Sequence, residues 1–538
     1  MKRWYKINCI LIIMIIIFML VIEYKVDMKN INKKPLSNVN KPKKLIIGRA
    51  NDALSLDPAN ITDIDSLRVT VNIFETLVKY EKDGKDIVPA LATSWKSSED
   101  GLSWTFRLRQ GVKFHDGTVF DANAVVFNFK RWMDDKNPYH NGKFEYWNYV
   151  FNGSPGLIKD VNALNKYSVE IKLNKPYAPF LSCLAMPVFA ISSPEAIKKY
   201  GDDVYKHPVG TGPFIFKRWD INKSIILTKN EQYWGQSSKV DEVEFKVIPS
   251  DKERIDELKE GKIHIADDIN PDEAVLIEDN SNFRLILRPC FNVAYIALNN
   301  KKAPFNNKNV RLAINYAIDK KDMIKKVYAD FAKPAKTFIP PLLIGYDEDI
   351  DKREYDIKMA RELLKKAGYY KGFSATLWVM NSPRSYLPKP IETANYIKDN
   401  LKKIKINVTI KTLNWNEYLN RIKNGEHEMA LIGWMGDNID PDNFLNTLFS
   451  SDNAKRGCAS NYSFYCNSTV DMLLVQARQT DDLNFRKLLY KNLLQIINDD
   501  MPSIPLTHNM PIMVLNVSVK GYVPSITGNE SLECVDIE

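Results

Sequence analysis

The chain has 538 residues, of which 45% are hydrophobic and 26% are charged. This composition predicts a folded protein with large buried cores and excludes a disordered or collagen-like chain. The net charge of +9 arises from 75 basic and 66 acidic residues that are spread along the chain. A nucleic-acid-binding protein concentrates its basic residues, so we expect no nucleic-acid partner.

The N-terminal segment has the pattern of an export signal. Basic residues precede an unbroken apolar run over residues 9–22, and no small-residue cleavage site follows it. Cys9 starts this run, whereas a lipid-attachment cysteine would follow it. We therefore favour an uncleaved signal-anchor over residues 1–27, with a cleaved signal peptide as the alternative. The rest of the chain would be extracytoplasmic and anchored to the cell membrane through a tether over residues 28–43.

Export would place the cysteines in an oxidising compartment. Cys458 and Cys466 flank a short polar stretch and are candidates for a local disulfide, worth about 2–3 kcal/mol. We expect the scattered Cys183, Cys290 and Cys534 to be buried thiols. The chain contains no CxxC pair, which argues against a zinc ribbon or a thioredoxin motif.

The elements that follow alternate between strands and helices. An apolar strand is expected at Leu45–Gly48, and strict alternation over Leu102–Leu108 predicts a half-buried strand. Asp121 is a suitable N-cap for an amphipathic helix. A loop rich in Gly and Pro at 208–213 enters another strand, and residues 311–328 have the apolar spacing of a helix.

The stretch 375–444 is the most informative part of the sequence. It predicts a βαβαβ unit, and strands joined by helical crossovers are parallel. The expected strands are 375–380, 406–413 and 429–433, and the expected helices are 391–404 and 415–423.

Two charged residues follow strands of this unit, Arg384 after the first and Asp437 after the third. Ligands of such sheets bind outside the carboxyl ends of the strands. An arginine fork suits a ligand carboxylate, and an aspartate suits a ligand ammonium, so the pair can clamp a small zwitterion such as an amino acid or short peptide. A mutual salt bridge between them, or two solvated loop charges, is the structural alternative.

Sequence signals for catalysis are weak. None of the six histidines lies in an HExxH motif, and no GxSxG nucleophile motif or phosphate-binding loop occurs. The acidic run 437–442 lacks the central glycine and distal glutamate of an EF-hand. We expect no enzyme activity, no metal and no cofactor.

Seven short motifs stand out along the chain: VPALATSW (88–95), WTFRLRQGVKFHDG (104–117), DANAVVF (121–127), PVGTGPF (208–214), YWG (233–235), VRLAINYAID (310–319) and GWMGDNIDPDNF (433–444). Together they resemble the extracytoplasmic solute-binding proteins of peptide ABC transporters, family 5 (cluster C), from about residue 44 to the end. The motif at 433–444 is similar to the dipeptide-binding branch of that family.

The resemblance implies an α/β, two-lobed periplasmic-binding-protein fold (type II, cluster C) with an extra inserted domain. Lobe I would comprise residues 44–75, 206–289 and 508–538. The inserted domain II would comprise residues 76–205, and lobe III residues 290–507.

The resemblance also implies a function. The protein would capture short peptides, most plausibly dipeptides, by hinge closure and deliver them to an ABC permease as a monomer. Asp437 would hold the peptide ammonium and Arg384 the carboxylate, with Trp434, Gly436 and Trp415 near the ligand. Core packing is the alternative role of both tryptophans. The same fold can bind another solute (an oligopeptide, nickel or haem) or act as a peptide-sensing receptor.

Overall fold

The structure is a computed structural model that describes residues 42–81, 84, 86–154 and 156–538, with five positions before residue 42. Most of the expected anchor and nearly all of the expected tether therefore lie outside the described residues. Within the described part of the chain, no helix is long and apolar enough to cross a membrane. Residues 44–538 form one compact unit, and the following description concerns that unit.

A seven-stranded sheet contains the first strand of this unit, which confirms the strand expected at Leu45–Gly48. Parallel pairing joins β1 to both β10 and β11, and alternate side chains of β1 are buried. In sheet order its strands are β12 (Phe283–Leu287), β19 (Ile512–Asn516), β11 (Ile265–Ile269), β1 (Lys44–Arg49), β10 (Glu242–Val247), β9 (Ser224–Lys229) and β8 (Phe214–Asp220).

A six-stranded sheet contains the predicted βαβαβ unit and is mixed, because β13 runs antiparallel to β17 and β18. In sheet order its strands are β14 (Ala332–Pro334), β18 (Ser503–Asn509), β13 (Asn292–Leu298), β17 (Met429–Met435), β15 (Phe373–Met380) and β16 (Ile406–Leu413). The crossover helices are α12 (Pro390–Lys402) and α13 (Trp415–Lys423). All five elements of the predicted unit are therefore confirmed.

A four-stranded antiparallel sheet forms a third layer, with Asp121 as the N-cap of its neighbouring helix α3, as expected. Asp121 accepts hydrogen bonds from the backbone N–H groups of Asn123 and Ala124. In sheet order the strands are β4 (Ala92–Ser97), β5 (Ser103–Leu108), β7 (Ser168–Leu173) and β6 (Ile158–Asn165). Helices α3 (Ala122–Met133) and α4 (Glu145–Phe151) lie between β5 and β6 in the chain, and α5 (Phe180–Leu184) and α6 (Pro194–Tyr200) follow β7.

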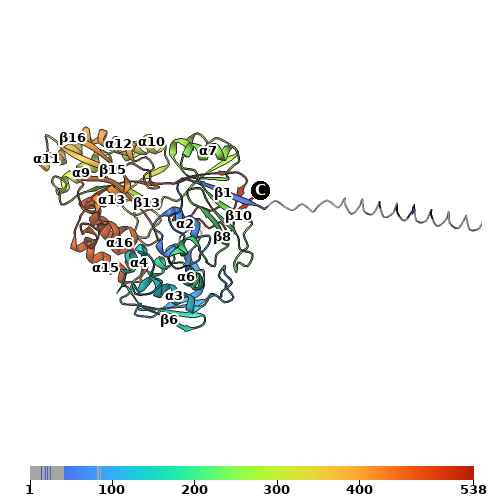
Figure 1. Cartoon of the computed structure of the whole chain (residues 1–538). Coiled ribbons are helices and arrows are strands. Elements are labelled where there is room, and N and C mark those ends of the chain that lie inside the picture. The colour runs from blue at the N-terminus through green and yellow to red at the C-terminus, as the bar shows by residue number, and fades with distance from the viewer. Residues whose placement is uncertain are drawn as a thin grey trace, which may run out of the picture. The chain divides into compact units, whose positions relative to one another are not determined.

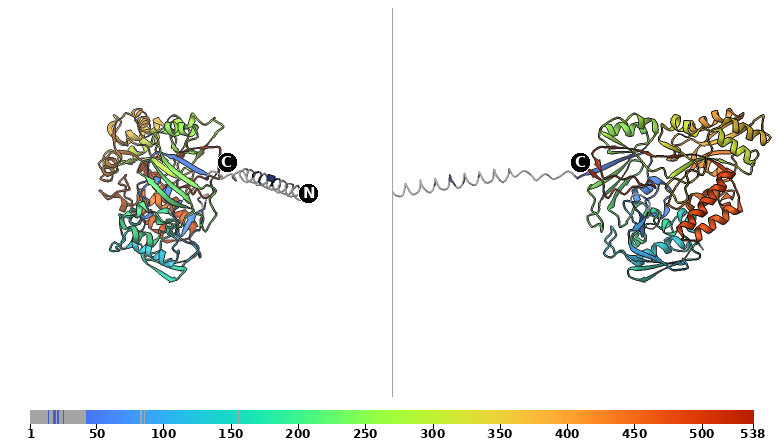
Figure 2. Two further views of the ribbon diagram at one scale, coloured as in Figure 1. Left: turned by 45° about the vertical axis from the view of Figure 1, so that its right-hand side comes forward. Right: turned by 180° about the vertical axis from the view of Figure 1, so that it is seen from behind.

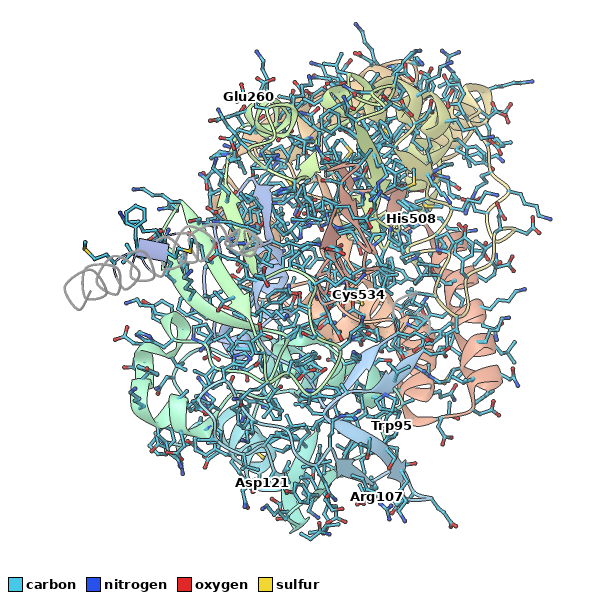
Figure 3. All side chains as sticks on the ribbon, turned by 90° about the vertical axis from the view of Figure 1, so that its right-hand side faces the viewer. Trp95, Arg107, Asp121, Glu260, His508 and Cys534 are labelled. Carbon is cyan, nitrogen blue, oxygen red and sulfur yellow. The ribbon has the colours of Figure 1, made fainter. Side chains whose placement is uncertain are left out.

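Figure 1 shows α3 and β6 at the lower end of this unit, with α7 and α12 at the upper end and α2 near the middle. Figure 2 shows the same arrangement from two further sides. In Figure 3, Trp95, Arg107 and Asp121 mark the lower end and Glu260 the opposite end. The remaining helices include α2 (Ile64–Thr70), α7 (Asp251–Lys259), α8 (Pro271–Val275), α9 (Lys308–Ala317), α10 (Lys320–Tyr328), α11 (Ile357–Lys366), α14 (Asp442–Phe449), α15 (Ser468–Gln479) and α16 (Leu483–Asp500).

The helix predicted over 311–328 is two helices. The first, α9, ends at Ala317, and Asp319 then caps α10 by accepting a hydrogen bond from the backbone N–H of Asp322. The apolar spacing continues through the break because both helices bury one face in the same core. Periodicity alone therefore did not reveal the cap.

The strands of each large sheet come almost entirely from one of the three expected segments. The six-stranded sheet extends slightly beyond its segment, because β18 ends at Asn509. The domain boundaries themselves stay a prediction. The largest core lies beneath the six-stranded sheet, and an aromatic core that includes Trp132 and Trp147 lies beneath the four-stranded one.

Candidate functional site

The carboxyl ends of β15 and β17 lie at the same edge of the six-stranded sheet. These two strands are parallel neighbours, with Leu377 opposite Met429, whereas β16 pairs on the far side of β15. The loop after β15 carries Arg384, and the loop after β17 carries Asp437. The topology therefore places both predicted residues at the edge where ligands of such sheets bind.

Neutral hydrogen-bond donors surround the Asp437 carboxylate. The Tyr146 hydroxyl donates to Oδ1 at 2.7 Å, and the Asn443 side-chain amide donates to Oδ2 at 3.2 Å. Asn443 in turn accepts from the backbone N–H of Asp437 at 3.1 Å and from Trp434 Nε1 at 3.0 Å. Trp434 therefore fixes the amide that orients the carboxylate.

No cation pairs with Asp437 among the described residues. Burial raises its pKa to about 6, although the bonds from Tyr146 and Asn443 favour the charged form. Asp437 is half-buried, and a carboxylate that is partly withdrawn from water and held only by neutral groups is stabilised when a positive charge binds beside it. The site therefore has the electrostatics of a binding point for a cationic group.

Tyr146 reaches Asp437 from a different part of the fold. It lies on α4, beside the four-stranded sheet, and Tyr149 one turn later forms a hydroxyl–hydroxyl hydrogen bond with Thr447 of α14. The ring of Tyr149 also lies 6.2 Å from that of Trp434, centroid to centroid. Helix α4 thus closes over the loop that follows β17.

Arg384 is held in a tight turn and stacks on an aromatic ring. Its backbone exchanges hydrogen bonds with Leu387, at 3.1 and 2.8 Å. Its guanidinium carbon lies 3.9 Å from the centroid of the Trp415 ring, at the start of α13. This contact orients the guanidinium and gives Trp415 a place beside the predicted carboxylate-binding group.

Arg384 has no ion-pair partner within the described part of the chain, and its Nε is buried without a hydrogen-bond partner. Burial lowers the pKa of the guanidinium, while Tyr386 and Asp65 raise it. The structural alternative of a mutual Arg384–Asp437 salt bridge is therefore wrong: each group remains available to a ligand.

Arg384 and Asp437 line two neighbouring cavities. The Asp437 chamber has a volume of about 170 Å³ and includes Tyr146 and Gly436 in its wall. The Arg384 chamber has a volume of about 690 Å³. Both chambers share Ile64 of α2 and Met435 at the end of β17, so one elongated ligand can reach both.

Gly436 contributes through its small size. A Cβ atom at this position would lie 2.1 Å from a ring carbon of Phe291, which is almost fully buried. Its backbone N–H also donates to the Phe291 carbonyl at 3.0 Å. Gly436 therefore lets the Asp437 loop pass close to β13.

The disulfide expected between Cys458 and Cys466 is absent, because both are free thiols. Their sulfurs face different backbone carbonyls, those of Lys455 and Phe464. The short sequence spacing suggested a closed loop, but Asn461 organises this segment through its own bonds to the carbonyls at 450 and 465.

The three other described cysteines differ in burial. Cys183 and Cys290 are buried, as expected, whereas Cys534 is half-buried.

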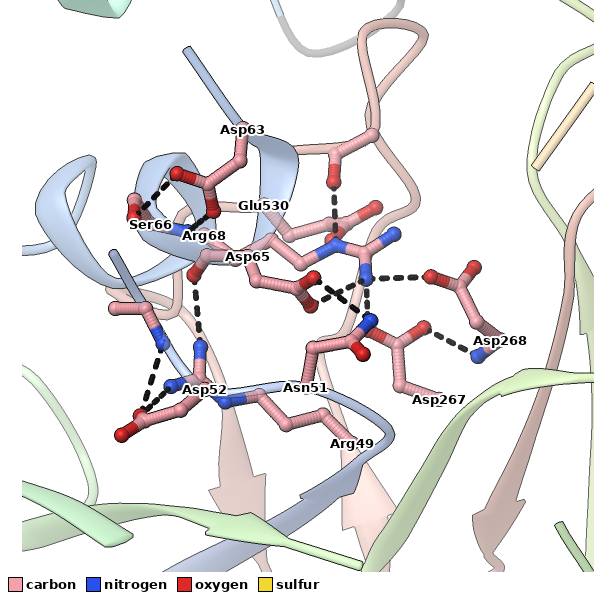
Figure 4. Close-up of polar contacts among 12 residues, drawn as sticks. Arg49, Asn51, Asp52, Asp63, Asp65, Ser66, Arg68, Asp267, Asp268 and Glu530 are labelled. Carbon is pink, nitrogen blue, oxygen red and sulfur yellow. Dashed lines mark hydrogen bonds and ion pairs between the residues drawn. The ribbon is translucent and has the colours of Figure 1, made fainter. Parts of the chain in front are cut away.

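Sequence reasoning missed Tyr146, Asn443 and a buried charge network beside the Arg384 chamber. Asn443 lies six residues beyond Asp437 in the sequence, so its proximity offered a signal. Tyr146 is 291 residues away from Asp437 and offered none. Figure 4 shows part of the network, which joins Arg68 to Asp267 and Asp268. The described residues contain no His, Cys, Asp and Glu group arranged to hold a metal ion.

Comparisons with known proteins identify the family of the chain. The profile "Bacterial extracellular solute-binding proteins, family 5 Middle" matches residues 86–456. The dipeptide-binding protein of Escherichia coli K12 is 36% identical over 487 residues, which cover 87% of this chain and 90% of that protein. Heme-binding protein A of Haemophilus influenzae is 35% identical over 508 residues, which cover 91% of each.

A solved structure is similar throughout the folded part. It is an ABC transporter-associated periplasmic binding protein from Helicobacter pylori in complex with the peptide STSA. It is 37% identical, has a TM-score of 0.81, and the match covers 92% of this chain and 99% of that one. The fold is therefore the two-lobed fold of periplasmic binding proteins, and the chain belongs to the bacterial extracellular solute-binding proteins of family 5.

Proposed function

We propose that this protein captures short peptides with free termini, chiefly dipeptides, and delivers them to an ABC permease. Asp437 binds the peptide ammonium and Arg384 binds the carboxylate. The observation that carries the proposal is the half-buried Asp437 carboxylate, which has neutral donors and no cation partner among the described residues. The ligand bridges the parts of the fold and therefore favours the closed state.

The relatives support a peptide ligand and leave a second solute class in view. A dipeptide-binding protein and a structure with bound peptide support peptides, whereas a heme-binding relative of nearly equal identity supports haem as the second candidate. The Asp437 chamber favours the peptide, because haem carries carboxylates and no ammonium to meet this aspartate.

Calorimetry with terminus-blocked ligands tests the assignment of each end. Asp437→Asn keeps the side-chain size and removes the charge, which should cost about 2–5 kcal/mol, or about thirty- to several-thousand-fold in affinity. An N-acetylated dipeptide should bind wild type weakly and lose little more in Asp437→Asn. A C-amidated dipeptide should behave in the same way towards Arg384→Ala.

Arg384→Lys is the matched control, because it keeps the charge and loses the fork and the stack on Trp415. It should weaken binding less than Arg384→Ala. Equal affinity of acetylated and free dipeptides for wild type would show that Asp437 does not hold the ammonium. Tight haem binding without dipeptide binding would favour the second candidate.

We further propose that the protein is a monomer, that it has no peptidase activity and that its N-terminal apolar segment is retained as a membrane anchor. A dipeptide incubated with the purified protein should be recovered intact. Light scattering should give the molecular mass of a single chain. Mass analysis of the membrane-extracted protein should find an N-terminus before residue 22. Sustained turnover, a dimer, or a mature start near residue 30 would contradict the respective statement.

A further inference from the structure

The Arg384 chamber has more room and more negative charge than a peptide carboxylate requires. Its volume is about 690 Å³, four times that of the Asp437 chamber. The charged residues of its wall are the carboxylates Asp65, Asp251, Asp268, Asp272 and Glu392 and the cations Arg254, Arg384 and Lys389.

Most of these charges already have partners. Arg254 pairs with Asp251, and Lys389 pairs with Asp272. Asp268 lies 2.6 Å from Arg68 Nη1 and 3.2 Å from Arg288 Nη1, beneath the wall. When a ligand carboxylate binds Arg384, two charged residues of the wall are left without a close ion-pair partner within the described part of the chain. Both are negative, namely Asp65 and Glu392.

Asp65 has no close ion pair among the described residues, although the Asn51 side-chain amide donates to its Oδ2 at 3.2 Å and the charges of Arg68 and Arg49 favour its ionised form. Its Oδ1 is 3.8 Å from Arg68 Nη1, which lies closer to Asp267, at 2.9 Å, and to Asp268 (Figure 4). The network contains two cations, Arg68 and Arg288, and four carboxylates, Asp65, Asp267, Asp268 and Glu530. A positive charge from outside would offset this excess.

Glu392 faces the chamber from the other part of the fold. It lies in the first turn of α12, which packs on the six-stranded sheet, whereas Asp65 lies on α2 beside the seven-stranded sheet. The Glu392 side chain is exposed and has no ion pair or hydrogen bond among the described residues. Both carboxylates therefore line the same cavity from different parts of the fold and add their negative potentials there.

Asn509 provides an independent indication of a ligand in this chamber. Its side chain is 3% exposed, and its amide nitrogen donates to the Ser385 carbonyl beside Arg384. Its side-chain oxygen is buried and has no hydrogen-bond partner. A buried acceptor without a partner is costly, and an N–H group of a bound ligand would satisfy it.

We propose that the Arg384 chamber selects peptides whose carboxyl-terminal residue carries a cationic side chain, lysine or arginine, held between Asp65 and Glu392. This inference rests on the proposed function, because it requires the peptide carboxylate at Arg384. The inference adds a side-chain preference to the recognition of the two peptide termini. It predicts that this preference applies to the carboxyl-terminal residue and not to the amino-terminal one.

Calorimetry with four dipeptides tests it: Ala-Lys, Ala-norleucine, Lys-Ala and norleucine-Ala. Norleucine keeps the aliphatic chain of lysine without the ammonium. Ala-Lys should bind about tenfold more tightly than Ala-norleucine, the effect of one partly desolvated charge pair. Lys-Ala should have no such advantage over norleucine-Ala.

Asp65→Asn and Glu392→Gln should each reduce the ratio of the Ala-Lys affinity to the Ala-norleucine affinity several-fold. Glu195→Gln is the matched control, since Glu195 lies in the first turn of α6, away from the chamber, and should leave the preference intact. If thermal unfolding shows that Asp65→Asn does not fold, Glu392→Gln provides the test, because Glu392 is exposed. Equal binding of all four dipeptides would overturn this inference alone, whereas binding of none would overturn the proposed function with it.

Discussion

At the scale of single residues, Asp437 is the group that we propose binds the peptide ammonium, so its charge state should control affinity. Its pKa is raised to about 6 by burial, and the groups that face it are Tyr146, Asn443 and another acid of the same chamber, Asp63, whose pKa burial also raises. An ammonium ligand requires the ionised carboxylate. Affinity should therefore be full above about pH 7 and fall as the pH drops through 6, by about tenfold at pH 5.

The same shift has a consequence for stability. A carboxyl whose pKa is higher in the folded state binds its proton more tightly there, so the free energy of unfolding should fall as the pH rises from about 4 to 6.

Calorimetry of one dipeptide between pH 5 and 8 measures the effect of pH on binding, with Asp437→Asn as the control. A variant affinity that still falls tenfold at pH 5 would assign the titration to another group.

At the scale of elements, helix α4 supplies one of the two side-chain donors that hold the Asp437 carboxylate. Tyr146→Phe removes the hydroxyl that donates to Oδ1 at 2.7 Å and leaves the ring in place. A hydrogen bond to a charged group contributes about 1.5–3 kcal/mol, so affinity for a dipeptide should fall about ten- to a hundredfold. The free energy of unfolding should change less, because the bond matters most in the closed, liganded state.

Tyr139→Phe is a matched control, since its hydroxyl makes no hydrogen bond within the described residues and it precedes α4 in the same segment. A loss of dipeptide affinity in Tyr146→Phe has two possible causes, a failure of the protein to close and a change in the charge of Asp437. Small-angle scattering would separate them. A protein that remains extended at saturating dipeptide would assign the loss to closure, and a fully compact one would assign it to the charge of Asp437. Unchanged affinity would show that α4 does not hold the carboxylate.

The elements predicted best are those with a repeated local pattern. The βαβαβ unit was predictable because buried strands and amphipathic helices alternate within seventy residues, and the parallel topology then placed Arg384 and Asp437 at one edge. Tyr146 was not predictable, because its contact with Asp437 depends on how two sheets far apart in sequence pack together. The division of 311–328 into two helices was missed because a cap at Asp319 leaves the apolar spacing unchanged.

At the scale of the whole molecule, a buried charge network joins the C-terminal segment to β11 and to the link between β12 and β13. Arg288 donates to Asp267 of β11 at 2.7 Å and forms a two-bond pair with Glu530 at 2.6 and 3.0 Å. All three side chains are at least 95% buried. Burial raises the pKa of Asp267, but Arg288 and Arg68 outweigh it and lower the pKa to about 2.

Removal of Arg288 should therefore destabilise the fold strongly. Arg288→Met leaves two buried carboxylates without their main partner, and breaking a buried pair in this way costs about 3–5 kcal/mol. Urea unfolding at pH 7 should show this loss for Arg288→Met and little change for Lys198→Met, which removes an exposed ion pair with Glu195. Because the pKa of Asp267 is depressed in the folded state, the stabilisation is present above about pH 4 and is lost as the pH falls towards 2. The difference between wild type and Arg288→Met should shrink over that range, and a difference that is independent of pH would show that packing of the Arg288 stem, not its charge, stabilises this junction.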